Sequence, residues 1–145
     1  MSTIIGLDHG SRRIGVAIGD TETGMAFTRP AILRRNLVSD LAAIAEVIST
    51  DAVEMIVIGL PLNMDGSEGV QATAARTFGE RLATTGIGVA YEDERLSSWE
   101  ATERLSSTGR RPRRRSGELD SAAARVILQQ YLDARRRTAP PEETA

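Results

Sequence analysis

Three acidic residues stand at the ends of predicted secondary-structure elements, where carboxylates could do chemistry. Asp8 closes a β-branched apolar run, Glu94 ends another within the acidic cluster Glu92, Asp93 and Glu94, and Asp120 opens an apolar helical pattern. Alternation along a strand places Glu92 and Glu94 on one face and Asp93 on the other. Taken singly, each acid has an equally good structural explanation. Asp8 could be a turn residue, Glu94 a polar residue at a strand end, and Asp120 an acid at a helix N-terminus.

Together, the three acids indicate a metal site. If the strands that carry Asp8 and Glu94 lie close in one sheet, both carboxylates emerge at the same edge, and a helix packed over that edge brings Asp120 near them. Three neighbouring carboxylates repel one another, and a divalent cation would compensate this charge. Oxygen ligands favour Mg²⁺ or Mn²⁺, and a two-metal carboxylate site can hydrolyse phosphodiester bonds. We therefore predict that these three acids are both catalytic residues and metal ligands.

The positive charge of the chain is concentrated near its C-terminal end. All 18 basic residues are arginine; residues 108–137 hold nine of them against three acids, for a net charge of +6, while the rest of the chain carries −8. A basic patch in an otherwise acidic chain is typical of polyanion binding, although a solvated loop is the common alternative. The run lies just before Asp120, which favours contact with a phosphate backbone.

We predict nucleic-acid contacts for this run and for four residues near other strand ends or loops. Arg13, Asn63 and Arg95 could equally be hydrogen-bonding residues at turns. The complete set is Arg12, Arg13, Asn63, Arg95, Arg110, Arg111, Arg113, Arg114 and Arg115.

Several classes of protein are excluded by composition. The 145 residues contain no cysteine and one histidine, His9, which excludes disulfides, thiolate zinc sites and His-rich metal sites. We keep His9 outside the catalytic set, as a structural residue or a phosphate contact. No apolar run reaches the roughly 18 residues of a membrane helix, and there is no signal-peptide pattern, so we expect a soluble, cytoplasmic protein without membrane contact.

The hydrophobic pattern predicts an α/β protein in the order β-β-β-α-β-α-β-α-α. Strands are predicted at residues 3–7, 13–19, 25–33, 55–58 and 87–91, the first three as an antiparallel meander. The first helix is predicted to be capped by Ser39 or Asp40, the second to bury Val70 with Phe78, and the third to start near Ser97. The result is a mixed five-stranded sheet with helices on both faces, in one domain over residues 1–137 with a disordered tail at 138–145.

Four segments resemble the motifs of the YqgF family, also called RuvX, within the ribonuclease H-like superfamily. They are DHGSRRIGVA at 8–17, GLPLNMDG at 59–66, DERLSS at 93–98 and DSAAA at 120–124. The first motif alone is weak, because actin-like ATPases share its strand end. All four occur in order, and the resemblance covers nearly all of residues 3–133.

The resemblance implies a ribonuclease H-like fold and a metal-dependent nuclease site carried by Asp8, Glu94 and Asp120. It also implies processing of the 5′ end of the pre-16S rRNA, alone or in a ribosomal precursor particle. Some relatives are described as resolvases of four-way DNA junctions, which need two active sites and therefore a homodimer; a nuclease acting on RNA could be a monomer. A non-catalytic RNA-binding factor is a further alternative. An actin-like ATPase would require a second domain, for which 145 residues are too few.

Overall fold

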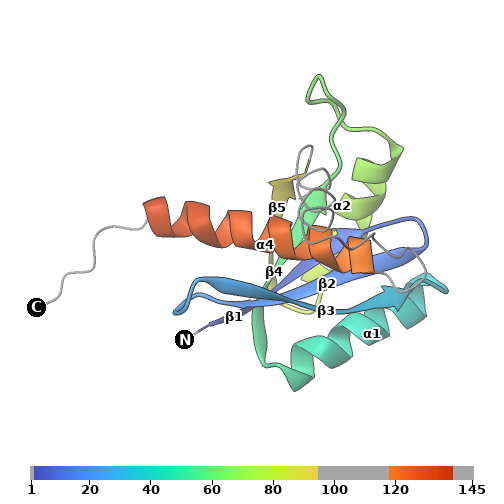
Figure 1. Cartoon of the computed structure of the whole chain (residues 1–145). Coiled ribbons are helices and arrows are strands. Elements are labelled where there is room, and N and C mark those ends of the chain that lie inside the picture. The colour runs from blue at the N-terminus through green and yellow to red at the C-terminus, as the bar shows by residue number, and fades with distance from the viewer. Residues whose placement is uncertain (1, 95–117, 139–145) are drawn as a thin grey trace, which may run out of the picture.

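The computed structural model describes residues 2–94 and 118–138, as the coloured ribbon in Figure 1 shows. Five strands and three helices make up this part of the chain. In chain order they are β1 (Thr3–His9), β2 (Arg13–Asp20), β3 (Met25–Leu33), α1 (Leu37–Thr50), β4 (Val53–Leu60), α2 (Val70–Ala83), β5 (Gly88–Asp93) and α4 (Glu118–Thr138). The third helix and the arginine run predicted from the sequence lie outside the described residues.

The strands form one mixed sheet in the order β3-β2-β1-β4-β5. β1 pairs antiparallel with β2, and β2 with β3, which confirms the predicted meander. β4 lies parallel to β1 on its other side, and β5 lies parallel to β4. The carboxyl ends of β1, β4 and β5 therefore meet at one edge of the sheet, where open α/β sheets commonly place their ligands.

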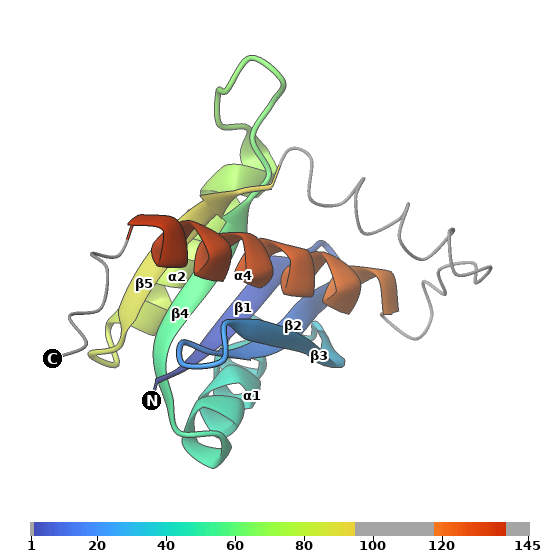
Figure 2. The ribbon, with the colours of Figure 1, turned by 60° about the vertical axis from the view of Figure 1, so that its left-hand side comes forward.

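Helices cover both faces of the sheet, as predicted. Figure 2 shows α4 crossing one face, with α1 and α2 on the other. Two apolar clusters reflect these layers. The cluster under α1 and α2 includes Ile44 and Phe78, and the cluster under α4 includes Ile127 and Leu128. Within the part of the chain that is described, no helix is both long and apolar enough to cross a membrane.

The first helix begins earlier than the sequence pattern suggested. Asn36 is its N-cap, in an extended conformation, and the Asn36 side chain accepts a hydrogen bond from the Ser39 N–H at 2.8 Å. Asp40 is not a cap, because it is buried and accepts a hydrogen bond from the Arg35 N–H at 3.0 Å. The prediction that Ser39 or Asp40 caps this helix is therefore wrong, since the side chain of Asn36, just upstream, accepts the hydrogen bond from a free N–H of the first turn.

The buried stripe of α2 also differs from its prediction. Phe78 is buried as expected, but Val70 is 88% exposed. Val70 is the first residue of α2, directly after the loop that projects beyond the sheet edge in Figure 1. The helix instead buries small residues, Ala72 and Ala75, together with Phe78 and Leu82. Small residues on the inner side let α2 pack closely on the sheet.

Candidate functional site

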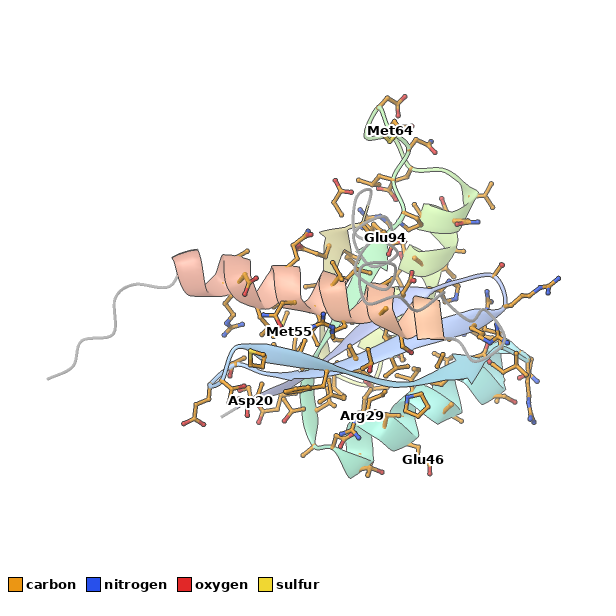
Figure 3. All side chains as sticks on the ribbon, in the orientation of Figure 1. Asp20, Arg29, Glu46, Met55, Met64 and Glu94 are labelled. Carbon is orange, nitrogen blue, oxygen red and sulfur yellow. The ribbon has the colours of Figure 1, made fainter. Side chains whose placement is uncertain are left out.

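Two of the three predicted acids meet at the carboxyl ends of the parallel strands. Asp8 is the penultimate residue of β1, and Glu94 directly follows β5. The Glu94 N–H donates to the Leu60 carbonyl at 3.0 Å, which extends the pairing of β5 with β4 by one step. Figure 3 shows Glu94 at this edge of the sheet, beside α4. Glu94 and Ile127 of α4 both border the space above Gly59, so the Glu94 side chain lies on the face that α4 covers.

The carboxyl groups of Asp8 and Glu94 are hydrogen-bonded to each other. Burial, the charge of Asp8, a hydrogen bond with Asp8 and the charge of Asp93 together raise the pKa of Glu94 to about 9. A pKa this high favours the protonated form of Glu94 at neutral pH. Glu94 is buried and is the inner member of the pair, and Asp8 is half-buried and is the member nearer to solvent.

One oxygen of the pair has no hydrogen-bond partner. Glu94 Oε2 is buried and receives no hydrogen bond. A buried carboxyl oxygen without a donor is costly, and a bound cation compensates such an atom. The donor atoms of the pair are carboxylate oxygens, which suit a hard divalent cation such as Mg²⁺ or Mn²⁺. The residues present therefore fit a divalent cation, held by Asp8 and Glu94.

The third predicted acid lies on α4. Asp120 is the third residue of α4, the helix that crosses the face of the sheet on which Glu94 lies. α4 is packed tightly there: a Cβ on Gly6 would lie 2.7 Å from Leu128 Cβ. The side chain of Asp120 is outside the described part of the structure, and no cluster of three possible metal ligands occurs among the described residues. Asp120 as a third ligand stays a prediction.

Two of the predicted nucleic-acid-binding residues lie at the same edge of the sheet. Arg12 is exposed in the turn between β1 and β2, and Arg13 is the partly buried first residue of β2. Asn63 is exposed on the loop after β4, where its side-chain amide donates to Ser67 Oγ at 2.9 Å and so orders the loop. The structure thus shows the turn-forming bond that was one of the two interpretations of Asn63. Arg95, Arg110, Arg111, Arg113, Arg114 and Arg115 lie outside the described residues.

His9 lies on the opposite face of β1 from the carboxyl pair. Its ring stacks against Phe78 of α2, with the ring centroids 4.8 Å apart. Burial and the charge of Arg34 lower the pKa of His9, while Asp40 partly offsets them. Of the two roles expected for His9, a structural residue or a phosphate contact, an uncharged ring packed on a phenylalanine supports the first.

The sequence pattern missed two residues that hold the turn after β1. Arg34 donates from Nη1 to the Gly10 carbonyl at 2.8 Å, and its backbone N–H donates to the Arg12 carbonyl at 2.8 Å. Asp40 pairs with Arg34 at 3.5 Å, between Oδ2 and Nε. This ion pair fixes the backbone next to Asp8. Sequence spacing gave no signal for it, because Asp40 resembles an ordinary acid in the first turn of a helix.

The fold is similar to that of two proteins of known structure. Thermus thermophilus RuvC in complex with a Holliday junction substrate has a TM-score of 0.62 at 15% identity, over 97% of this chain and 99% of that chain. The large terminase nuclease of the thermophilic phage G20c has a TM-score of 0.54 at 13% identity, over 90% of this chain and 81% of the other. The fold is therefore ribonuclease H-like, in the arrangement of RuvC.

The sequence places the chain in one family of this class. The family model described as "RuvX: Holliday junction resolvase" matches residues 2–134. The chain belongs to the RuvX family. A protein of Anaeromyxobacter dehalogenans is 48% identical over 132 residues, covering 90% of this chain and 96% of its own length. A protein of a Synechococcus species is 45% identical over 137 residues, covering 91% of this chain and 89% of its own length. Both are named "Putative pre-16S rRNA nuclease".

Proposed function

We propose that the protein is a divalent-metal-dependent endonuclease that hydrolyses phosphodiester bonds in the 5′ region of the pre-16S rRNA. The observation that carries this proposal is the pairing of Asp8 with the buried Glu94, whose Oε2 atom has no hydrogen-bond partner. The names of the two relatives support the choice of RNA as substrate. Maturation of ribosomal RNA would place the protein in the cytoplasm.

Each predicted site residue has a distinct role in this proposal. Asp8, Glu94 and Asp120 would hold Mg²⁺ or Mn²⁺, and such a cation would supply activation of water and compensation of charge on the leaving oxygen. Glu94 is buried, whereas Asp8 is half-buried and is therefore the more accessible of the two ligands. Arg12 and Arg13, at the same edge of the sheet as Asp8, would contact the phosphate backbone.

A cleavage assay with two substrates tests the proposal. We expect the protein to cut a pre-16S rRNA fragment in the presence of Mg²⁺ or Mn²⁺, and to leave it intact with a chelator. Asp8→Asn, purified in the same way, controls for contaminating nucleases. Intact RNA in every condition, including with precursor particles, would contradict the proposal and favour the non-catalytic RNA-binding alternative.

A junction resolvase is the second candidate function. The description of the family model and the match over 97% of the chain to a RuvC bound to a Holliday junction favour it. Resolving a four-way junction requires two active sites, so this candidate function predicts a homodimer. Symmetric cutting of a four-way DNA junction, with the pre-rRNA left intact, would select it; a stable monomer under assay conditions would weigh against it.

The arginine run is expected to contribute to binding through phosphate contacts. Replacing Arg113, Arg114 and Arg115 with alanine should weaken RNA binding and reduce the slope of log affinity against log salt by roughly two to three. Fluorescence anisotropy over a series of salt concentrations measures this slope. The same measurement on Arg29→Ala is the control, because Arg29 lies on the edge strand β3, paired with Asp51. An unchanged slope in the triple variant would identify the run as a solvated surface.

A further inference from the structure

Gly59 lies on the central parallel strand, between the two strand ends that carry the acids. β4 separates β1 from β5, and neighbouring strands are about 4.8 Å apart, so Asp8 and Glu94 reach each other only across β4. Leu7 of β1 pairs with Ile58, which brings the next residues, Asp8 and Gly59, alongside each other. The side chain of residue 59 would therefore stand between the two carboxyl groups.

The space above Gly59 is already filled by Glu94. A Cβ atom built on Gly59 would overlap Glu94 Oε2 and would lie 2.6 Å from Ile127 Cδ1 of α4. Real Cβ atoms essentially never approach other heavy atoms so closely, so any other residue here would displace the Glu94 carboxyl group. The displaced oxygen is Oε2, the same atom that is buried without a hydrogen-bond partner.

Other glycines on this face of the sheet have a different function. A Cβ on Gly6 would meet Leu128 and the Ala124 carbonyl of α4, and a Cβ on Gly19 would meet Leu132. These two glycines allow close packing of α4 against the sheet. Of the strand glycines Gly6, Gly19, Gly59 and Gly88, only Gly59 has a carboxyl oxygen as the atom nearest to its missing side chain.

We infer that Gly59 is a positioning residue of the metal site. Because Gly59 has no side chain, the Glu94 carboxyl group can extend over β4 and reach Asp8. The two carboxyl groups can then bind one cation. This inference rests on the proposed function, because it concerns the cation that the nuclease would use. Gly59 touches neither substrate nor cation in this role and acts only through Glu94.

The test compares Gly59→Ala with Gly6→Ala. Both add one methyl group on the same face of the sheet and both crowd α4, but only the first overlaps Glu94. Binding of Mn²⁺ is measured by electron paramagnetic resonance, and stability by thermal melting. We expect Gly59→Ala to weaken Mn²⁺ binding about tenfold or more, as changes to residues that support metal ligands commonly do. Gly6→Ala should lower the melting temperature and keep the affinity of the wild type.

A second background keeps the inference testable if Gly59→Ala folds poorly. Ile127→Val removes the Cδ1 atom that the new methyl group would meet, so Gly59→Ala in this background retains only the overlap with Glu94. The loss of Mn²⁺ affinity should persist there, relative to Ile127→Val alone. In a Glu94→Ala background, Gly59→Ala should cause no further loss, because the residue through which it acts is absent.

The outcomes separate the inference from the proposed function. If the wild-type protein binds Mn²⁺ and Gly59→Ala binds it equally well, the inference is overturned and the proposed function stands. If Gly59→Ala and Gly6→Ala lose affinity equally, Gly59 is a packing residue and the inference is overturned as well. If the wild-type protein itself binds no Mn²⁺, both fail.

Discussion

Asp8→Asn is expected to reduce metal-dependent cleavage about a thousandfold or more without loosening the fold. The substitution keeps the shape of the side chain and removes the charge that the outer member of the pair offers to a cation. Metal ions supply several kcal/mol of transition-state stabilisation, and each 1.4 kcal/mol corresponds to a tenfold change in rate. Single-turnover cleavage of the pre-rRNA fragment at saturating metal measures the loss directly.

The melting temperature of the same variant separates catalysis from structure. The charge of Asp8 is one of the causes that raise the pKa of Glu94, so removing it reduces the loss of folding stability that this raised pKa causes near neutral pH. Asp8→Asn should therefore melt at the wild-type temperature or above it when no metal is present. Asp93→Asn is the matched control: it also removes one negative charge near Glu94, but alternation along β5 turns Asp93 to the other face. Cleavage by Asp8→Asn within tenfold of the wild type, or a large drop in its melting temperature, would show that Asp8 is not a catalytic ligand.

Much of this architecture could be read from the sequence because strand and helix periodicities differ. Alternation along β5 assigned Glu92 and Glu94 to one face, and the structure confirms it: Glu92 accepts a hydrogen bond from Gln130 of α4 at 2.8 Å, on the face where Glu94 lies. The position of Glu94 at a strand end beside α4 followed from the order of the elements. These features depend on local pattern and chain topology, which the sequence contains.

Features that depend on contacts between distant residues could not be predicted. The apolar run before Gly59 indicated a strand followed by a loop. It gave no sign that the Glu94 carboxyl group lies over this glycine. The high pKa of Glu94 arises from burial and from Asp8, and neither is visible in spacing. The start of the first helix was predicted wrongly for a local reason: Asn36, Ser39 and Asp40 are all good caps, and sequence alone does not show that Asn36 accepts from the Ser39 N–H while Asp40 accepts from the Arg35 N–H.

Glu94→Gln is expected to stabilise the metal-free protein at about pH 8 by roughly 2 to 4 kcal/mol, and to have little effect at about pH 5. The pKa of Glu94 is about 9 in the folded protein, against an ordinary value of 4.5. Below 4.5 the carboxyl group is protonated in both states, and its contribution to stability is fully present. Between 4.5 and 9 the unfolded chain has lost this proton while the folded chain keeps it, so the group lowers the free energy of unfolding by up to about 1.4 kcal/mol per pH unit.

Denaturant unfolding across this pH range, with and without a divalent cation, measures the effect as a difference between wild type and variant. Glu92→Gln is the matched control, because it makes the same change two residues earlier, where the carboxylate accepts a hydrogen bond from Gln130 instead of facing Asp8. Saturating Mg²⁺ or Mn²⁺ should stabilise the wild type by binding the ionised pair, and should remove the advantage of Glu94→Gln. Parallel pH profiles for the wild type and Glu94→Gln would mean that Glu94 is ionised without a cation, which would remove the electrostatic reason for a metal at this site.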